Sequence, residues 1–309
     1  SYVGAPRTEI DARLAATRLR NILRLNASFS FVTGAIGRLA AAPVAELLAV
    51  DQVWLVRALG AGLLGFASVV FIVSGSGTSI LRPWSLLISF GDLSWVAGTV
   101  AVVALSWLSG EGAILMGLLG LVVLALGVSQ LRARVNLNTA ADRIGVDLNE
   151  SPPVEIVALR RPSPVAAEQL WPVMTDHQLY ANLALNLKAA EGLTPNGPGF
   201  RRSCTDRVGR TWFETCTLWD PERRFDVEID TSDYPYPLRL MQGSWSVEPT
   251  GTESSTVAMT FAFQPTRGLY GRVFVPLMHL TFPPILRRIA RGWQKAAATP
   301  LGAAKETSG

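Results

Sequence analysis

The sequence predicts a bundle of four transmembrane α-helices followed by an α+β domain with an antiparallel sheet and a long C-terminal helix. The first observation is composition: 49% of the 309 residues are hydrophobic and only 17% are charged, which is unusual for a soluble protein. The second is distribution, because residues 25–131 contain very few charges whereas residues 151–309 have an ordinary globular mixture. A membrane half and a soluble half follow from this asymmetry.

Four apolar segments can be drawn, at residues 25–48, 53–74, 84–108 and 113–131. Each is long enough, or nearly so, for a hydrocarbon core of about 30 Å. The first is the weakest because it contains Arg38, Pro43 and Glu46. Its last part is compatible with a position in the membrane interface, which would follow a span shorter than the full segment. Four crossings place both ends of the bundle on the same side.

The distribution of charge predicts the orientation, since cytoplasmic loops retain Lys and Arg in excess. Arginines occur before the first segment, after the second and after the fourth: Arg7, Arg13, Arg18, Arg20, Arg24, Arg82, Arg132 and Arg134. The other two loops offer the acidic residues Glu46, Asp51 and Glu111. We therefore expect a multi-pass protein of the inner (cytoplasmic) cell membrane, with both termini and the soluble domain in the cytoplasm.

The regions outside the bundle complete the expected domain organisation. Residues 1–24 read as an amphipathic cytoplasmic helix with Thr8 as its cap. Residues 132–152 are polar and end in a proline pair, which discourages a helix and predicts a linker. A linker this short would hold the next domain, residues 153–297, close to the inner leaflet. Residues 298–309 are expected to be a flexible tail.

Two charged residues inside the predicted spans, Arg38 and Asp92, are candidates for an intramembrane polar contact. Counting about 1.5 Å per residue from the inner end places Asp92 roughly 12 Å deep and Arg38 roughly 20 Å deep. An ion pair between them that sets helix register is the structural interpretation. A polar ligand or proton site, or contact with a second protein, remains open at this point.

The soluble half alternates short strands with turns. Residues 154–160 read as a strand and residues 163–176 as a short helix with Pro164 in its first turn. Further strands are expected at residues 199–206, 210–219, 223–232, 238–249 and 254–265, and a helix at residues 283–298. If a four-residue turn at residues 207–210 closes its hairpin, Cys204 lies opposite Phe213, the two cysteines point to opposite faces, and no disulfide forms.

This order of elements is that of a helix-grip domain, in which a curved antiparallel sheet surrounds the C-terminal helix. The stretches VEIVALRRPSPVAAEQLWPVMTDHQLYANL, GPGFRRSCTDRVGRTWFETCTLWDPERRFDVEID, YPYPLRLMQGSWSVEPTGTESSTVAMTFAF and ILRRIARGWQ resemble the START-like (SRPBCC) superfamily. That superfamily includes polyketide cyclases/dehydrases, lipid-transport domains and coenzyme Q-binding proteins. The membrane half resembles uncharacterised four-helix bacterial membrane proteins, which adds topology but no function.

The resemblance implies an elongated apolar cavity between the sheet and the C-terminal helix, suited to a lipid, isoprenoid, quinone or polyketide. Fold alone does not decide among these ligands. Apolar residues that could line the cavity are Trp171, Trp212, Leu218, Trp245, Met259, Phe261 and Phe263. For each of them, packing in the core is the favoured interpretation.

Glu214 is the most informative polar position. It shares one strand face with Trp212, Cys216 and Leu218, so that face either carries a carboxylate inward or has unusually apolar neighbours outward. An inward carboxylate needs a partner such as Arg202 or Arg239. The pair is either structural or a ligand-anchoring or acid/base group.

Residues 264–284 are more apolar than a cytosolic surface tolerates. They are compatible with the first part of the terminal helix, broken near Pro276 and closing the cavity mouth. They are equally compatible with insertion into the membrane interface, which the following Arg287, Arg288, Arg291 and Lys295 would favour at an anionic surface.

Three functions fit these features. The first is a membrane-anchored protein that binds a hydrophobic small molecule, with membrane lipids as its surroundings. The second is an accessory subunit of a larger complex of membrane proteins. The third is a cyclase or dehydratase that uses Glu214 with Arg202 or a tyrosine of DYPYP. No catalytic residue can be assigned, so an enzyme is the less favoured class.

Other partners have little support in the sequence. The net charge is only +4 and no basic run is interleaved with aromatics, which argues against nucleic acid. The two cysteines and two histidines lack the spacing of a metal site. We therefore expect no metal and no cofactor.

Overall fold

The computed structural model describes residues 1–145 and 148–299. The chain forms two compact units, one of residues 11–153 and the other of residues 1–10 together with the chain from Val154 onward. The expected tail at residues 298–309 lies almost entirely outside the described residues, as do residues 146–147 of the expected linker.

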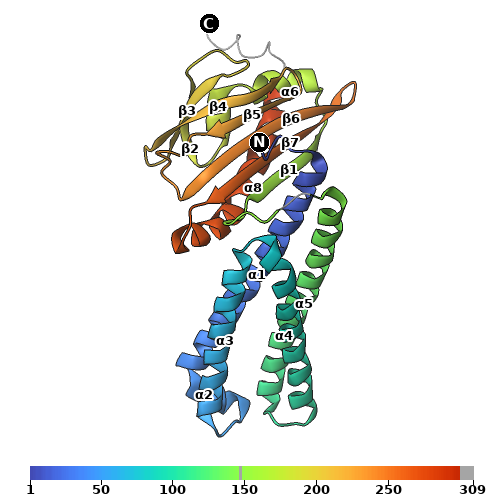
Figure 1. The fold of residues 1–309 in the computed structure, drawn as a ribbon, viewed down its shortest axis with the longest axis vertical. Helices are drawn as coiled ribbons and strands as arrows, with labels where there is room; N and C mark the ends of the chain where they lie inside the picture. Colours follow the sequence, from blue (N-terminus) through green and yellow to red (C-terminus); the bar gives the residue numbers. More distant parts are fainter. Residues whose placement is uncertain (146–147, 300–309) are drawn as a thin grey trace. The chain divides into compact units, whose positions relative to one another are not determined.

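The first unit is helical (Figure 1). Its helices are α1 (Arg7–Leu39), α2 (Ala41–Leu48), α3 (Val53–Ser74), α4 (Thr78–Ala104) and α5 (Gly110–Ile144). Within the described residues, three of them, α3, α4 and α5, are long and apolar enough to cross a membrane. A membrane-associated protein is therefore plausible, and three of the four expected spans have the required helix.

The first expected span is a bent pair of helices rather than one helix. α1 and α2 meet at an angle of 94°, so a fourth span would exist only if this bent pair were a single crossing. Pro43 explains the bend, because in a continuous helix its ring would clash with the carbonyl of Leu39, four residues earlier. The two charged residues of this segment, Arg38 and Glu46, lie on either side of the break, and both side chains are exposed.

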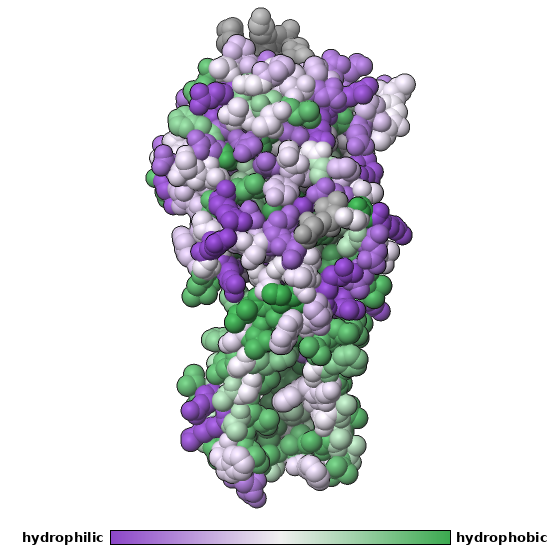
Figure 2. Space-filling view, in the orientation of Figure 1, coloured by the Kyte–Doolittle hydropathy of each residue, from purple (hydrophilic) through white to green (hydrophobic). Residues whose placement is uncertain are grey.

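Small residues bring α1 and α3 into close contact. A Cβ atom on Gly60 would lie 2.6 Å from the backbone N of Arg38 and 2.8 Å from the carbonyl oxygen of Gly34. Only glycine fits at this crossing, which is how small residues allow helices to pack in a membrane. The outward faces of the unit are apolar, and Figure 2 shows its visible surface as mostly hydrophobic.

Asp92 is a buried polar contact, but its partner is not the expected one. Its carboxylate accepts hydrogen bonds from the side-chain amides of Asn26 and Gln130, each at 2.9 Å, whereas Arg38 is exposed. The ion pair with Arg38 was therefore a wrong prediction. The prediction from depth in the membrane considered only charged partners and assumed that the first segment was straight. It therefore missed the two amides.

The helices also extend beyond the boundaries that charge patterning suggested. α1 joins the expected N-terminal helix and the first apolar segment into one element. α5 continues through residues 132–144, most of the expected linker, and ends at Gly145 in a left-handed conformation. Polar residues such as Arg134 and Asn138 sit on this extension and hydrogen-bond to Arg82 of α4, so polarity there reflects the end of an apolar span and not the end of the helix.

The second unit is an antiparallel sheet with a long C-terminal helix. Within the described residues one sheet of seven strands has the order β1-β7-β6-β5-β4-β3-β2. The strands are β1 (Glu155–Ser163), β2 (Leu187–Gly192), β3 (Arg201–Asp206), β4 (Thr211–Asp220), β5 (Arg224–Ile229), β6 (Leu238–Gly251) and β7 (Ser254–Pro265). The helices are α6 (Ala167–Met174), α7 (His177–Leu183) and α8 (Leu269–Ala298).

The core of this unit lies between the sheet and α8, which runs behind the strands in Figure 1. Leu286, Ile289 and Trp293 recur at helical spacing on α8 and are almost completely buried. They pack with Phe261 and Trp245 from the strands into one hydrophobic cluster. A curved antiparallel sheet with a C-terminal helix is the architecture expected of a START-like domain.

The β3–β4 hairpin differs from the expected register by one residue. Cys204 lies opposite Trp212, not Phe213, because Asp206 accepts hydrogen bonds from the backbone N–H groups of both Val208 and Arg210 and so closes a tighter turn. Cys204 and Cys216 therefore share the inward face, contrary to expectation. Both are buried free thiols.

The first residues of the chain pack on the face of the sheet opposite α8. The backbone N–H of Tyr2 donates to Gln242 at 2.8 Å, and Arg224 donates to the carbonyl oxygen of Val3. Val3 is 1% exposed. These contacts satisfy polar groups of β5 and β6 that would otherwise lie uncovered on the outer face.

Candidate functional site

A cavity of about 540 Å³ lies between the sheet and α8, within the size range of small-molecule sites. The α7–β2 connection, strands β4 to β7 with the β5–β6 loop, and α8 form its walls. Its lining residues, most of them apolar, are Tyr180, Leu185, Asn186, Leu187, Trp212, Glu214, Ile229, Tyr234, Tyr236, Leu238, Met241, Phe261, Phe274, Leu277, Met278, Leu280, Thr281, Phe282, Pro284, Ile285, Leu286 and Ile289.

The charged group at the cavity wall is Glu214, held by Arg202. The two residues lie directly opposite each other on β3 and β4, so alternation turns both side chains to the inward face. Nε of Arg202 donates to Oε2 of Glu214 at 2.8 Å, and Nη2 lies 2.6 Å from the same oxygen. Nε1 of Trp212 donates to Oε1 at 3.0 Å. Both carboxylate oxygens are therefore engaged by the protein.

The guanidinium of Arg202 lies behind the cavity wall, enclosed by aromatic rings. Its Cζ is 4.7 Å from the centroid of Tyr180 and 5.3 Å from that of Trp245, a favourable cation–π arrangement. Burial acts to lower the pKa of Arg202, but the Glu214 carboxylate and its other neighbours more than reverse this and raise the pKa. Arg202 and Glu214 thus form a buried ion pair.

His177, the first residue of α7, contacts the other side of this pair. Its Nδ1 lies 3.4 Å from Nη1 of Arg202. Burial, and next the positive charge of Arg202, lower the pKa of His177 below its ordinary value of 6.5. The imidazole is therefore neutral near pH 7, with Nδ1 free to accept from the guanidinium.

Tyrosines supply the neutral polar groups of the cavity. Burial, and next the Glu214 charge, raise the pKa of both Tyr180 and Tyr234, so both hydroxyls stay protonated. Tyr234 donates weakly to the sulfur of Met241, and Tyr236 donates to Asp206 at 2.9 Å. The polar end of the cavity therefore offers neutral hydroxyls beside a carboxylate that is already paired.

The mouth of the cavity is rimmed by exposed leucines. Leu185, Leu277 and Leu280 line the cavity, yet 47%, 50% and 74% of their surface is exposed. On α8 the exposed apolar surface continues toward the start of the helix through Val273, Tyr270 and Leu269. We call the stripe of Leu269, Tyr270, Val273, Leu277 and Leu280 the α8 apolar stripe.

The structure places eight of the nine expected ligand-binding residues in three groups, and Leu218 lies apart from them. Trp212, Glu214 and Phe261 line the cavity. Arg202 does not line it but holds Glu214 in place. Four others are buried in the packed core: Trp171, Trp245, Met259 and Phe263. Trp245, for example, stacks on Phe225 with ring centroids 5.0 Å apart, so plain packing accounts for its position.

Leu218 lies outside the cavity, and its expected role is corrected. It is 43% exposed, because the β4–β5 register shifts between Cys216 and Leu218. An irregularity of this kind inverts the alternation of the residues that follow it. Trp219 consequently turns inward in its place and packs on Trp171.

Most of the cavity wall was not assigned from the sequence. The missed residues come from the end of β5, the β5–β6 loop, β6 and α8, including Ile229, Tyr234, Met241, Phe274 and Met278. The signals that could have found them were the tyrosines of DYPYP and the apolar run at residues 264–284. Residues 269–284 of that run belong to one helix, α8, which continues through Pro276. The expected break near Pro276 was therefore wrong, although several of these residues line the cavity, as the first of the two interpretations expected.

Metal chemistry has no evident site in the part of the chain that the structure describes. There, no group of three or more His, Cys, Asp or Glu side chains could hold a metal ion. His279, which pairs with Glu155 at 3.2 Å, and His177 are each engaged in separate contacts.

Comparison with known proteins identifies the second unit. Residues 156–298 match the protein family described as polyketide cyclase / dehydrase and lipid transport. That region is therefore a START-like domain, while the resemblance of the helical unit to four-helix bacterial membrane proteins stays a prediction. No curated protein matches the chain.

Several solved structures are similar to part of this chain. An aromatase/cyclase from a Streptomyces species is 16% identical, with a TM-score of 0.38, over 47% of this chain and 91% of that one. A START superfamily protein from Mycobacterium smegmatis is 11% identical, with a TM-score of 0.38, over 46% and 96%. Norcoclaurine synthase from Thalictrum flavum, in complex with dopamine and hydroxybenzaldehyde, is 16% identical, with a TM-score of 0.38, over 46% and 85%.

Proposed function

Given a polyketide cyclase/dehydrase and lipid transport domain at residues 156–298, we propose that this chain is a membrane-anchored protein that binds a hydrophobic ligand. The ligand class is a lipid, isoprenoid or quinone, taken up or presented at the cytoplasmic face of the inner membrane. The observation that carries the proposal is the cavity of about 540 Å³ with exposed leucines around its mouth.

The chemistry of the wall favours a ligand with a large apolar body. Most lining side chains are aliphatic or aromatic, and each Å² of apolar surface that leaves water contributes about 25 cal/mol. The neutral hydroxyl of Tyr180 or Tyr234 can hydrogen-bond to one polar group of the ligand. Because Glu214 is already paired, a ligand needs no positive charge to occupy the site.

The α8 apolar stripe supports loading from a membrane. Its residues are exposed although they are large and hydrophobic, and an apolar surface of this kind usually marks an interaction site. Arg267 and Arg272 lie within a few residues of the stripe in sequence, which suits an anionic lipid surface. A cavity that opens at such a surface allows a lipophile to enter without crossing water.

Binding is favoured over cyclase or dehydratase chemistry by the state of the polar groups. A carboxylate that acts as a general base needs an oxygen that is free to accept a proton from the substrate. In Glu214, both oxygens already accept hydrogen bonds, from Arg202 and Trp212. Burial raises the pKa of Tyr180 and Tyr234, so these hydroxyls are poor bases at neutral pH.

The proposal can be tested by photo-crosslinking on the full chain in lipid vesicles. Three diazirine-bearing probes, palmitic acid, farnesol and a short-chain ubiquinone analogue, distinguish the ligand classes. We expect at least one of them to label the peptides that contain Met241 and Met278, at the centre of the cavity wall. Labelling confined to the apolar helices of the other unit by all three probes would overturn the proposal.

Two tryptophan variants on α8 provide a matched pair. Thr281 lines the cavity and is exposed, and its hydroxyl donates within its own helix, to the carbonyl oxygen of Leu277. Thr281→Trp should therefore block the cavity without unfolding the domain. Val273→Trp, on the same helix and exposed but outside the cavity lining, keeps the α8 apolar stripe apolar, and tryptophan is favoured at membrane interfaces. It should therefore leave labelling at the cavity unchanged.

A further inference from the structure

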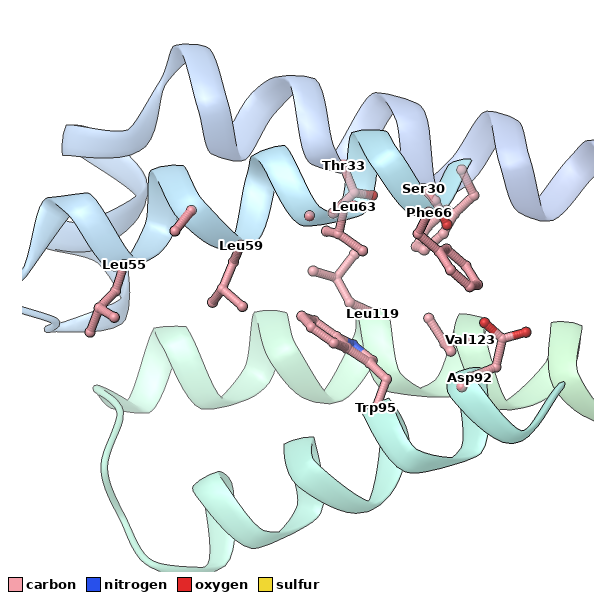
Figure 3. Close-up of a pocket in the computed structure, with 14 residues that line it drawn as sticks. Ser30, Thr33, Leu55, Leu59, Leu63, Phe66, Asp92, Trp95, Leu119 and Val123 are labelled. Atoms are coloured by element: carbon pink, nitrogen blue, oxygen red, sulfur yellow. The ribbon is translucent and has the colours of Figure 1, made fainter. Parts of the chain in front are cut away.

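A second cavity, of about 450 Å³, lies inside the helical unit (Figure 3). Helices α1, α3, α4 and α5 contribute to its walls. Leu59 and Phe66 line it from α3, Trp95 from α4 and Leu119 from α5. Figure 3 shows the aromatic ring of Trp95 pointing from α4 into the space between the helices. Most of the lining is apolar, and its polar members are Ser30, Thr33 and Asp92.

Asp92 supplies the carboxylate of this cavity, which we call the bundle pocket. It lines the pocket, and only 4% of its surface is exposed. Both of its hydrogen bonds go to one oxygen, Oδ2, which accepts from Nδ2 of Asn26 and Nε2 of Gln130. The amides are themselves held in place, because Ser30 donates to Asn26 and the Ser89 hydroxyl, shared with the carbonyl oxygen of Ser85, contacts Gln130.

The second carboxylate oxygen, Oδ1, has no hydrogen-bond donor among the residues that the structure describes. Figure 3 shows the carboxylate directed from α4 toward Phe66 and Ser30, at one end of the pocket. Neither hydrogen-bond partner of Asp92 carries a charge, in contrast to Glu214 and Arg202. An acceptor in an apolar cavity is costly unless a donor reaches it.

We propose that the bundle pocket binds an amphipathic molecule that has an apolar chain and a hydrogen-bond donor as its head group, a hydroxyl or an ammonium. The apolar chain lies against Leu59, Trp95 and Leu119, and the head group donates to Oδ1 of Asp92. This site is separate from the cavity of the START-like domain, and it does not depend on what that cavity binds.

The geometry distinguishes this ligand from an ordinary acyl chain of the bilayer. An acyl chain would fill the space between the apolar walls, but it would leave Oδ1 of Asp92 without a hydrogen-bond donor. A head group that only accepts, such as an ether or ester, would meet the carboxylate with no hydrogen bond between them. A donor is the group that completes the site, and polar groups inside membrane helices commonly mark such sites.

The chain offers matched variants for a test on the pocket walls. A Cβ atom on Gly62 meets no heavy atom within 4 Å, and Gly62 lines the pocket. Gly65, on the same helix, is equally open but does not line the pocket. Gly62→Leu therefore fills the pocket at little cost to the fold, and Gly65→Leu is its control.

The experiment compares three diazirine probes on the full chain in phosphatidylcholine vesicles: 1-hexadecanol, hexadecylamine and the methyl ether of 1-hexadecanol. Adducts are mapped to the peptides that contain Leu59 and Trp95. We expect the alcohol, the amine or both to label about fivefold more than the ether, as one hydrogen bond in an apolar site would give. Which probe prevails identifies the head group.

Variants distinguish a specific binding site from nonspecific contact with bilayer lipid. Gly62→Leu should lose most of the preferential labelling, and Gly65→Leu should keep it. Asp92→Asn keeps the shape of the side chain; if its oxygen takes the position of Oδ2, its NH₂ group takes that of Oδ1. The preference for the alcohol or the amine over the ether should then disappear, because hydroxyl and ether oxygens both accept from NH₂ and an ammonium group cannot. A purely structural Asp92 would not produce this change.

Two outcomes would overturn the proposal. One is equal labelling by the alcohol, the amine and the ether in the unmodified chain. The other is preferential labelling that survives in Gly62→Leu. Thr281→Trp should leave labelling of the bundle pocket unchanged, so this result stands or falls independently of the ligand cavity in the START-like domain.

Discussion

The cavity of the START-like domain and the bundle pocket have similar ingredients, yet the carboxylate in each is stabilised differently. Both are apolar and both have one acidic side chain in the wall. Glu214 is paired with the guanidinium of Arg202 and with Trp212, so both oxygens are used. Asp92 is held by two neutral amides through one oxygen only.

The comparison shows that a buried carboxylate is not by itself a sign of ligand chemistry. Where the fold supplies a cation and fills both oxygens, the acid is part of the scaffold and the apolar walls select the ligand. Where the fold supplies only amides and leaves an oxygen toward a cavity, the acid can select for a donor. Substitutions at both carboxylates and at control positions can test this distinction.

Arg202→Met should be the most damaging change, because it leaves Glu214 buried without its cation. Removing one partner of a buried ion pair typically costs about 3–5 kcal/mol. Urea unfolding of the full chain in detergent, followed by tryptophan fluorescence, measures it. The double variant Arg202→Met/Glu214→Leu should recover much of the loss.

A surface ion pair provides the control for this effect. Arg160 and Glu248 lie 2.6 Å apart, but both side chains are about half exposed. Arg160→Met should cost less than about 1 kcal/mol. Equal costs for Arg160→Met and Arg202→Met would contradict the view that Arg202 neutralises a buried charge.

In the helical unit the tight contact between α1 and α3 is expected to be the most sensitive point. Gly60→Ala places a Cβ atom within 3 Å of backbone atoms of Gly34 and Arg38, and overpacking of this kind costs about 1–3 kcal/mol. Gly62→Ala, two residues away in open space, should be neutral or stabilising. Thermal unfolding in detergent, with both variants side by side, tests the contact; equal melting temperatures would contradict it.

Much of the fold followed from simple periodicities in the sequence. Alternation in β3 and β4 was enough to suggest Arg202 as the partner of Glu214, and the helix expected at residues 283–298 is the second half of α8. Alternation failed at Leu218 because the irregularity after Cys216 depends on pairing with β5. The hairpin register failed because hydrogen bonds of Asp206, not the length of the turn, set it.

The candidate sites were harder to predict than the fold, for two physical reasons. Trp245, Met259 and Phe263 have the same composition as a cavity wall, but only packing decides that they are core. Depth counting paired Asp92 with Arg38 because it considered charges alone. The actual partners, Asn26 and Gln130, are neutral amides on other helices, and their proximity appears only when the helices are assembled.

Gln130→Met tests how strongly the two amides stabilise Asp92. It removes one of the two hydrogen bonds to the Asp92 carboxylate, and methionine keeps the size of the fully buried Gln130 side chain. Polar contacts between membrane helices average about 0.6 kcal/mol, so the cost should be far below that of Arg202→Met. Thermal unfolding in detergent measures it, and a cost of several kcal/mol would mean that Asp92 is fixed as firmly as Glu214.

The smallest expected effect is a dependence on pH near His177. Because its folded pKa lies below the ordinary value of 6.5, the unfolded chain binds a proton more readily than the folded one. The stability of the START-like domain should therefore fall as the pH drops below 6.5 toward the folded pKa. His177→Gln should remove this part of the pH dependence; urea unfolding between pH 8 and pH 5 measures the difference between the two proteins.

The central claim is that the cavity between the sheet and α8 holds a hydrophobic ligand. The most direct measurement is the yield of photo-crosslinked probe on the peptides containing Met241 and Met278, compared among the unmodified chain, Thr281→Trp and Val273→Trp in lipid vesicles. We predict strong labelling in the unmodified chain and in Val273→Trp, and loss of most labelling in Thr281→Trp. Equal yields in the two variants, or no adduct on these peptides from any of the three probes, would contradict the claim.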